Sequence, residues 1–346
     1  MGKIYNGQRI GILTAGGDCP GINAAIRGVG KTAIVNYGMR VIGISDGFTG
    51  LINKEYRELA EQDLSGIMTL GGTILGTSRE KPFKSNGKGK NEIRKPALIK
   101  EHYEQLGLDC LVCIGGNGTL KTAYLLSQEG LNIIGIPKTI DNDVWGTDIT
   151  FGFDSAVNIA TEAIDRLHST ANSHKRIMII ELMGHNTGWI ALYSGIAGGG
   201  DVILIPEIEY NEKKIADYLL NRFRENKAYS IMVVAEGVKT PGKDGAAAQY
   251  LSRKINELTG IETRETVLGY IQRGGTPSPM DRVLATRYGS AAADMIAKRE
   301  YGKMVALRKN EITSVPLEDV SGRIKLIEPD NPLVIKAKNM GTSFGD

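Results

Sequence analysis

Six short apolar runs dominate the organisation of this sequence. Each is rich in β-branched residues, lacks polar alternation and leads directly into glycine or an acidic residue: "RIGILTAGGDCPG", "LDCLVCIGGNGT", "LNIIGIPKTIDND", "RIMIIELMGHNTG", "DVILIPE" and "YSIMVVAEG". Continuous apolar runs of this length are typical of strands that are buried on both faces, as in a parallel sheet covered by helices. Ligands of such sheets bind beyond the carboxyl ends of the strands, where these glycines and acids collect.

Stretches with helical character separate the runs. They cover residues 20–36, 92–106, 119–128, 151–172, 211–225, 245–258 and 278–298. The alternation predicts a doubly wound α/β fold with a mainly parallel sheet and helices on both faces. Because 346 residues exceed the usual size of one domain, we expect two such lobes. Two polar stretches, 84–95 and 239–249, are predicted to be surface loops.

Composition excludes several classes of function. The net charge is +3 without a basic block, which argues against nucleic acid as the main partner. Since no apolar run approaches the length of a membrane span and no signal peptide is evident, a cytoplasmic protein without a membrane partner is expected. The "CLVC" stretch has metal-site spacing but lies inside an apolar run, so we predict two buried strand cysteines, Cys110 and Cys113.

Two glycine turns join a predicted strand to a helix. In "TAGGDCPGINAAIRG", Gly16 and Gly17 allow the backbone to approach a ligand, and Pro20 suits a helix N-terminus, where free amides favour phosphate. "GGNGTLKTAYLL" repeats the arrangement, with Thr119 expected to cap its helix. It lacks the third glycine of the dinucleotide fingerprint. Two such turns favour phosphate binding over ligand-free tight turns.

"PKTIDND", residues 137–143, follows the third run. By the two-residue period of a strand, Thr139, Asp141 and Asp143 would share one face. Two carboxylates and a hydroxyl suit one general base and one ligand of Mg²⁺, which needs only one or two carboxylates beside substrate phosphates. The alternative is an Asp-Asn turn whose side chains cap their own backbone.

Arginines occur singly at the ends of predicted strands or loops: Arg79, Arg176, Arg264 and Arg273. Guanidinium groups suit phosphate oxygens, although each arginine alone could also be a surface charge. Glu236 ends another apolar run, where it could accept a substrate hydroxyl or cap the backbone.

Taken together, these motifs resemble the 6-phosphofructokinase family. The resemblance covers nearly the whole chain, through "GILTAGGDCPGINAAIRG", "LGGTILGTSR", "IGGNGT", "PKTIDND", "SHKRIMIIELMGHNTGW", "AGGGDVILIPE" and "VLGYIQRGGTPSPMDRVLA" in unbroken order. It implies transfer of the γ-phosphoryl group of ATP to the 1-hydroxyl of fructose 6-phosphate with Mg²⁺, a reaction of glycolysis. It also implies two phosphofructokinase-like lobes: 1–150 plus about 272–325 for the donor, and 151–271 plus about 326–346 for fructose 6-phosphate.

The resemblance further implies a role for each matching residue. Asp141 would be the general base, supported by Thr139 and Arg176, and Asp143 would hold Mg²⁺ with Asn117 at a second metal position. Donor-binding residues would be Gly17, Arg79, Glu80, Gly116, Asn117, Gly118 and Thr119. Acceptor-binding residues would be Thr139, Ile140, Asp141, Arg176, Met183, Gly184, His185, Glu236, Arg264, Tyr270 and Arg273. In many members two of these arginines come from a neighbouring subunit, which implies a homotetramer or otherwise a homodimer.

Three positions depart from the usual family pattern. Asn117 replaces a metal-coordinating Asp, which removes one negative charge from the Mg²⁺ site. His185 replaces a common Arg in the sugar loop, and its charge, unlike that of arginine, depends on pH. Tyr270 replaces a common His at the 6-phosphate site and can donate a hydrogen bond without a full charge.

The choice of phosphoryl donor depends on two further positions. ATP-using members generally have Gly at both, and pyrophosphate-using members usually have Asp and then Lys; this chain has Gly118 and Lys138. Gly118 leaves room for a nucleotide, whereas Lys138 helps a bare pyrophosphate without excluding ATP. We therefore expect ATP, with a pyrophosphate-dependent enzyme as the alternative.

Other functions remain open at this point. The enzyme could act on a related sugar such as sedoheptulose 7-phosphate, or the chain could be a non-catalytic sugar-phosphate or nucleotide sensor, as Asn117 suggests. A Rossmann oxidoreductase lacks its fingerprint here. Arg27 and Lys31 lie on the first helix where ATP-dependent bacterial members of the family bind an effector phosphate, but a solvated helix face is the favoured interpretation, and regulation is undecided.

Overall fold

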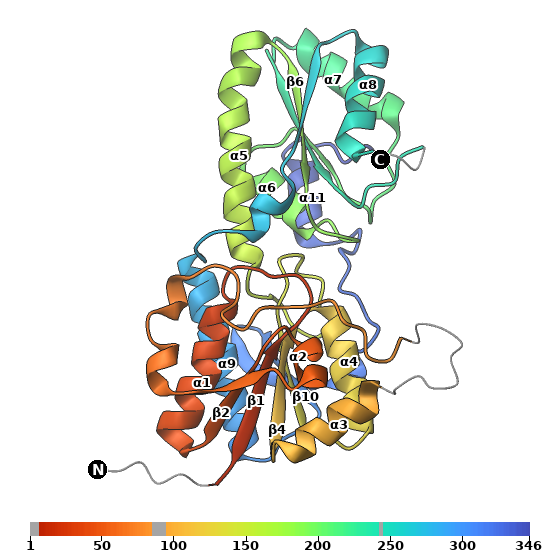
Figure 1. Cartoon of the computed structure of the whole chain (residues 1–346). Coiled ribbons are helices and arrows are strands. Elements are labelled where there is room, and N and C mark those ends of the chain that lie inside the picture. Colours follow the sequence, from red (N-terminus) through yellow and green to blue (C-terminus); the bar gives the residue numbers. More distant parts are fainter. Residues whose placement is uncertain (1–6, 85–94, 242–244) are drawn as a thin grey trace. The chain divides into compact units, whose positions relative to one another are not determined.

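The computed structural model describes residues 7–84, 95–241 and 245–346 (Figure 1). The chain divides into two compact units. The first comprises Met1–Thr139, Val144–Gly152 and Arg273–Ile324, and the second Ile140–Asp143, Phe153–Gln272 and Lys325–Asp346. Since each unit is assembled from three segments, neither is a continuous piece of the sequence.

The first unit is built on a sheet with the strand order β11-β10-β5-β4-β1-β2-β3 among the described residues. Its strands are β1 (Arg9–Thr14), β2 (Arg40–Ile44), β3 (Tyr56–Leu59), β4 (Cys110–Gly115), β5 (Ile133–Pro137), β10 (Lys303–Arg308) and β11 (Glu311–Pro316). The inner pairs are parallel, whereas the outermost pairs, β2 with β3 and β10 with β11, are antiparallel.

Helices cover both faces of this sheet. They are α1 (Ile22–Tyr37), α2 (Phe48–Asn53), α3 (Lys95–Gln105), α4 (Asn117–Gln128), α9 (Pro279–Ala297) and α10 (Leu317–Val320), with short 3₁₀ turns η1 (Glu61–Leu64) and η2 (Ile67–Thr69). Side chains of α2, α3, α4 and α10 share one apolar core with the strands. α1 and α9 pack closely together, because a Cβ on Gly28 would lie 2.8 Å from the carbonyl of Thr286 and one on Gly289 only 2.7 Å from the amide of Val29.

The second unit has a smaller sheet in which the order is β7-β8-β6-β9 and every described pair is parallel. The strands are β6 (Ile177–Leu182), β7 (Val202–Leu204), β8 (Ser230–Ala235) and β9 (Thr263–Val267). Its helices are α5 (Phe153–His174), α6 (Trp189–Ala197), α7 (Glu212–Arg224), α8 (Ala247–Thr259) and α11 (Pro332–Asn339), and η3 (Gly269–Arg273) follows β9. α5 and α6 lie on one side of this sheet and α7 and α8 on the other (Figure 1).

The predicted doubly wound α/β class is therefore confirmed. The six apolar runs form β1, β4, β5, β6, β7 and β8, and the predicted helices are present with small shifts at their ends. Residues 92–94 of the predicted helix 92–106 lie outside the described residues, as do 85–94 and 242–244 of the two predicted loops. None of the helices in the described part of the chain is long and apolar enough to cross a membrane.

The cysteines are structural, as predicted for Cys110 and Cys113. Both are fully buried in β4, Cys19 is buried as well, and all three thiols are free. Burial raises the pKa of each thiol above its usual value, so these side chains are inert at neutral pH.

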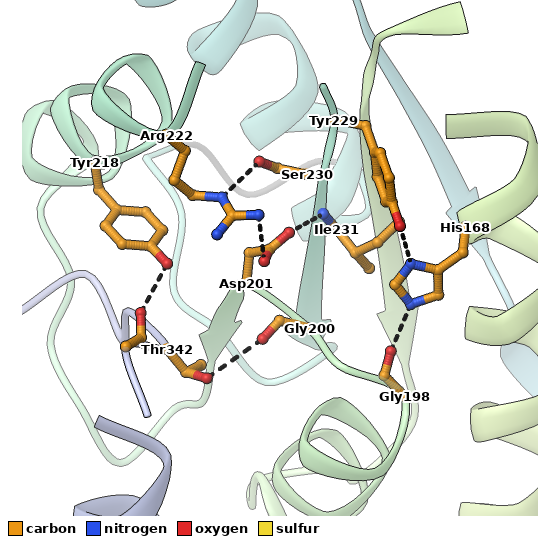
Figure 2. Close-up of polar contacts among 11 residues, drawn as sticks. His168, Gly198, Gly200, Asp201, Tyr218, Arg222, Tyr229, Ser230, Ile231 and Thr342 are labelled. Carbon is orange, nitrogen blue, oxygen red and sulfur yellow. Dashed lines mark hydrogen bonds and ion pairs between the residues drawn. The ribbon is translucent and has the colours of Figure 1, made fainter. Parts of the chain in front are cut away.

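A polar cluster lies at the amino ends of β7 and β8 in the second unit (Figure 2). Asp201 pairs with Arg222 of α7 at 2.6 Å and accepts a hydrogen bond from the amide of Ile231 at 2.9 Å. Arg222 also donates to the hydroxyl of Ser230 at 3.1 Å. Burial raises the pKa of the Asp201 carboxyl despite the opposing Ile231 amide and Arg222 charge. The ion pair thus links α7 to two strand ends.

We expect Arg222→Met to lower the free energy of unfolding by about 2 kcal/mol, because it leaves the half-buried Asp201 carboxylate without its partner. The loss should be larger at pH 8 than at pH 5. A carboxyl whose folded pKa is raised binds its proton more readily when folded, so stability falls as pH rises through that pKa. Urea unfolding at both pH values measures this effect.

Arg166→Met is the matched control for this experiment. Arg166 pairs with Glu162 at 2.5 Å on α5, but both side chains are mostly exposed, at 76% and 66%. Removing this pair should leave the urea midpoint within error. Equal losses for the two variants would show that the Asp201 pair is no stronger than a surface pair.

Residues near Ser343 pair with β7 at the edge of the second sheet. Ser343 forms a parallel bridge with Val202 of β7, and its carbonyl accepts a hydrogen bond from the amide of Ile203 at 2.9 Å. The amide of Ser343 in turn donates to the carbonyl of Asp201 at 3.0 Å. The edge of β7 is therefore covered by residues that come last in the sequence.

Candidate active site

The first glycine turn, Gly16 and Gly17, follows β1 and leads to α1. Gly16 has a φ of 86°, a left-handed conformation that glycine adopts without strain. Its amide donates to the carbonyl of Ser78 at 2.9 Å, and its carbonyl accepts from the hydroxyl of Thr77 at 2.7 Å. These bonds hold residues 77 and 78 beside the turn, and Arg79 follows directly in an exposed position.

Two cationic side chains lie against Gly17. Lys138, which is 3% exposed, donates a hydrogen bond from Nζ to the carbonyl of Gly17. A Cβ on Gly17 would lie 2.8 Å from Nη1 of Arg273. The charges of both residues also lower the pKa of the neighbouring Cys19 thiol, against the larger effect of burial. A glycine turn flanked by an ammonium and a guanidinium group is suited to phosphate oxygens.

The second glycine turn leads from β4 into α4. α4 begins at Asn117, with Gly116 as its N-cap, so the prediction that Thr119 caps this helix is wrong. Thr119 lies within the first turn and folds over Gly115, where any Cβ would collide with its side chain. The helix starts earlier because Gly116, in an extended conformation, makes the turn itself. The first-turn amides of α4 form a second site that favours anions.

Gly118 also lies in the first turn of α4. A Cβ built on it meets no atom of the described residues within 4 Å, and its φ is not in the left-handed region. The fold therefore does not require glycine at this position, where alanine would favour the helix by about 1 kcal/mol. Open space at a helix N-terminus is consistent with room for a ligand.

Glu80, a predicted donor residue, pairs with Lys95 at the start of α3, with 3.0 Å between Lys95 Nζ and Glu80 Oε1. This ion pair links Glu80 to α3, two residues after Ser78, which bonds to the first glycine turn. It does not place Glu80 on a ligand, so its role in donor binding stays a prediction.

The backbone of "PKTIDND" leaves the strand earlier than predicted. β5 ends at Pro137, residues 140 and 141 form a turn, and Asn142 has a left-handed φ of 52°. The prediction that Thr139, Asp141 and Asp143 share a strand face is therefore wrong, and the chain turns at residues 140–142 instead. Asn tolerates this conformation better than most residues, which explains the break in the strand period.

Residues 141, 142 and 143 of the turn each accept a hydrogen bond from another part of the second unit. The carbonyl of Asp141 accepts a hydrogen bond from Thr187 Oγ1 at 3.3 Å. Asn142 Oδ1 accepts from Lys325 Nζ at 2.9 Å, and the carbonyl of Asp143 accepts from the amide of Lys325 at 2.9 Å. Ile140 is 2% exposed and anchors the start of the turn in the apolar interior.

The predicted sugar loop follows the carboxyl end of β6. Met183 is buried, Gly184 has a φ of 153°, and His185 is left-handed with a φ of 54°. Glu236 Oε1, just beyond β8, accepts hydrogen bonds from the amides of Gly184 and His185 at 3.3 and 2.8 Å. Glu236 was expected either to accept a substrate hydroxyl or to cap the backbone. In the structure its carboxylate caps the backbone amides of this loop. The four residues are brought together at one end of the sheet.

Arg176 and Arg264 lie at the opposite end of that sheet. Arg176 precedes β6 and Arg264 is the second residue of β9. Both pair with Glu262, at 2.7 Å from Arg176 Nε and 2.5 Å from Arg264 Nη2. The hydrogen bond from Arg176 is the largest cause that lowers the pKa of Glu262. The structure joins these two arginines but does not bring them to the sugar loop of the same chain.

The remaining acceptor residues are divided between the units. Tyr270, in η3 of the second unit, is 71% exposed, whereas Arg273 belongs to the first unit and lies beside Gly17, where it would meet an added Cβ. Their assignment to one phosphate site stays a prediction. Sequence reasoning missed Thr187 and Lys325 as partners of the 140–143 turn, because no local motif marks either residue.

No group of three or more His, Cys, Asp or Glu side chains forms a metal site by itself among the described residues. Mg²⁺ does not need such a group, because it keeps several waters and binds substrate phosphates with one or two carboxylates. The donor chemistry of Asp143, a carboxylate 6% exposed and next to a fixed turn, fits that mode. Asn117, at the start of α4, could offer an amide oxygen.

The glycine turns of the first unit are suited to anions such as phosphate, and comparison with known families is more specific. The family model for phosphofructokinase matches residues 9–296. This chain belongs to the phosphofructokinase family, which comprises phosphotransferases. It is 61% identical over 338 residues to ATP-dependent 6-phosphofructokinase 3 of Bacteroides thetaiotaomicron, covering 98% of this chain and 100% of that protein.

Further relatives agree with this assignment. The ATP-dependent 6-phosphofructokinase of Spirochaeta thermophila is 57% identical over 358 residues, with 98% of each chain covered. The phosphofructokinase of Pichia pastoris has a TM-score of 0.83 and 32% identity over 92% of this chain, which spans 36% of that longer chain. The fold is shared with the pyrophosphate-dependent phosphofructokinase of Marinobacter aquaeolei, which is 23% identical with a TM-score of 0.82. The match covers 97% of this chain and 88% of that one.

Proposed function

We propose that this protein transfers the γ-phosphoryl group of ATP to the 1-hydroxyl of fructose 6-phosphate, giving fructose 1,6-bisphosphate and ADP in glycolysis. The observation that carries the proposal is the first glycine turn, where Lys138 and Arg273 flank Gly17 with two positive charges in a protein of this family. The relatives named above as ATP-dependent 6-phosphofructokinases support the donor and the acceptor.

In the proposed reaction, the 1-hydroxyl oxygen of the sugar forms a bond to the γ-phosphorus, while the bond from that phosphorus to the β–γ bridging oxygen of ATP breaks. Asp141 accepts the hydroxyl proton, and Thr139 steadies the transferring group, with Arg176 assisting. Such transfer depends on alignment and charge neutralisation more than on covalent chemistry by the protein. Mg²⁺, when bound, neutralises charge on the donor phosphates, and Asp143 and Asn117 would hold it.

Donor binding is proposed for the two glycine turns and the residues beside them: Gly17, Arg79, Glu80, Gly116, Asn117, Gly118 and Thr119. Gly118 supports ATP over pyrophosphate, because the space beside it is open and the fold does not demand glycine there. Lys138 would stabilise the phosphates of either donor. The first unit would thus carry the donor, and the second fructose 6-phosphate.

The sugar would be bound by the loop of Met183, Gly184 and His185, which Glu236 organises through the loop amides. Tyr270, Arg273, Arg176 and Arg264 would bind its 6-phosphate. Arg176 and Met183 flank a six-residue strand, which holds them about 20 Å apart in one chain. We therefore propose a homotetramer, or otherwise a homodimer, in which a second copy supplies Arg176 and Arg264. The expected location is the cytoplasm.

The test compares initial rates with ATP and with pyrophosphate at saturating fructose 6-phosphate and Mg²⁺. We expect turnover with ATP and at most a trace with pyrophosphate. Activity with pyrophosphate alone would favour the pyrophosphate-dependent alternative, which is suggested by Lys138. Turnover with neither donor would favour the non-catalytic sensor. Sedoheptulose 7-phosphate as acceptor tests the breadth of the sugar site.

A further inference from the structure

Lys325 contacts the 140–143 turn with both its backbone and its side chain. Its amide donates to the carbonyl of Asp143 at 2.9 Å, and its Nζ donates to Asn142 Oδ1 at 2.9 Å. Lys325 thus holds two neighbouring positions of this turn, Asn142 and Asp143. Lys325 is also the first residue of the segment with which the chain re-enters that unit.

Asn142, which accepts the hydrogen bond from Lys325 Nζ, determines the direction of the backbone in the turn. Asn142 is 3% exposed, and its φ of 52° lies in the left-handed region, which few residues other than glycine adopt readily. It separates Asp141, the proposed base, from Asp143, the proposed metal ligand. A change in the backbone at Asn142 would therefore reorient both carboxylates at once.

Lys325 is itself held by rigid parts of the second unit. Its carbonyl accepts a hydrogen bond from Trp189 Nε1 at 2.8 Å, and its Nζ lies 5.2 Å from the centre of the Trp189 ring. Two residues on, the amide of Ile327 donates to Glu207 Oε1 at 3.2 Å. Glu207 also accepts from the amide of Gly188 at 3.1 Å, at the start of α6. The contacts connect α6 to the turn through Lys325.

We propose that Lys325 is a positioning residue that fixes Asp141 and Asp143 through Asn142. The inference rests on the proposed function of these two carboxylates and adds a residue that no motif of the family resemblance included. A charge-assisted bond from the partly buried Lys325 ammonium is suited to the task, because it is stronger than a neutral hydrogen bond. The role requires the Lys325 side chain, not merely the presence of the segment.

The test is Lys325→Met, which keeps the length of the side chain and the backbone bond to Asp143 but removes the ammonium group. We expect kcat to fall about 10- to 100-fold, because small errors of alignment have effects of this size. KM for fructose 6-phosphate should change less than about threefold, since the sugar loop is untouched. Lys325→Arg, which retains a donor and the charge, should recover part of the lost kcat.

Lys338→Met is the matched control in the same C-terminal segment. Lys338 pairs with Asp346 and lies 5.6 Å from the centre of the Phe344 ring, so the variant also removes an ion pair and a cation–ring contact. Its kcat should equal that of the wild type. Asn142→Gly should lower kcat like Lys325→Met, and the double variant should lose little more, because the two changes break one contact.

Hydrogen exchange of the peptide that contains residues 140–143 gives a readout that needs no turnover. Lys325→Met should accelerate exchange there, and Lys338→Met should not. Unchanged kcat together with unchanged exchange in Lys325→Met would overturn the positioning role while leaving the proposed function intact. If the wild type itself used neither donor, the proposed function would fail, and the exchange result would still decide whether Lys325 orders the turn.

Discussion

Asp141→Asn is expected to lower kcat by about 10²–10⁴-fold, the range typical of a lost general base. Asparagine has nearly the same size but cannot accept the hydroxyl proton. The backbone contact of residue 141, in which its carbonyl accepts from Thr187, does not depend on the side chain and should persist. KM for both substrates should therefore stay within about threefold. Steady-state kinetics with ATP and fructose 6-phosphate measure the effect.

Asp165→Asn provides the control for this substitution. Asp165 is exposed on α5, and its replacement should leave both kcat and the urea midpoint unchanged. The urea midpoint of Asp141→Asn should also match that of the wild type, which separates a chemical effect from partial unfolding. A variant that turns over normally would remove Asp141 from the role of base.

Gly118→Asp is expected to reduce kcat/KM for ATP by about 100-fold or more. The added carboxylate would stand in the open space at the start of α4, where it would repel the donor phosphates that the helix N-terminus attracts. Stability should not fall, because an acidic residue in the first turn of a helix interacts favourably with its dipole. Rates with ATP and pyrophosphate, measured beside the urea midpoint, test both statements.

Gly118→Ala separates size from charge at the same position. Alanine has open space for its Cβ and a better helix propensity, so the variant should be at least as stable as the wild type. We expect an intermediate loss of kcat/KM for ATP, smaller than that of Gly118→Asp. ATP use that is unaffected by the aspartate would show that the nucleotide does not pass this position.

Six strands could be predicted from the sequence, but β2 and β10, which are buried inside the first sheet, were missed, as were strands at the sheet edges. β1, β4, β5, β6, β7 and β8 are mostly apolar and buried, and such runs are typical of a covered parallel strand. β9 reads "TRETV" and β3 reads "YREL"; both lie at sheet edges, where exposed polar positions hide the strand pattern. α6 was missed for the opposite reason, since a helix that is apolar nearly all round lacks the periodicity that marks an amphipathic one.

In the candidate site, local motifs could be predicted from the sequence, but contacts between distant segments could not. The glycine turns could be predicted because each is a local motif between a strand and a helix. Contacts between distant segments could not: Gly17 meets Arg273, and Asn142 meets Lys325, although nothing in either neighbourhood specifies the other. The turn at Asp141 was mispredicted because its course depends on the left-handed Asn142, which Asn permits but does not require.

The order in which the segments are synthesised has a consequence for how this chain first folds. β5 takes its place in the first sheet between β4 and β10, yet β10 begins at Lys303, after nearly all of the second unit has been made. At roughly 5–20 residues per second, the free edge of β5 waits on the order of ten seconds for its neighbour. β7, which ends at Leu204, waits somewhat less long for Ser343. Nascent chains of this protein therefore present two unpaired strand edges until Lys303 and Ser343 have been made, and during this period those edges are open to aggregation and to chaperones.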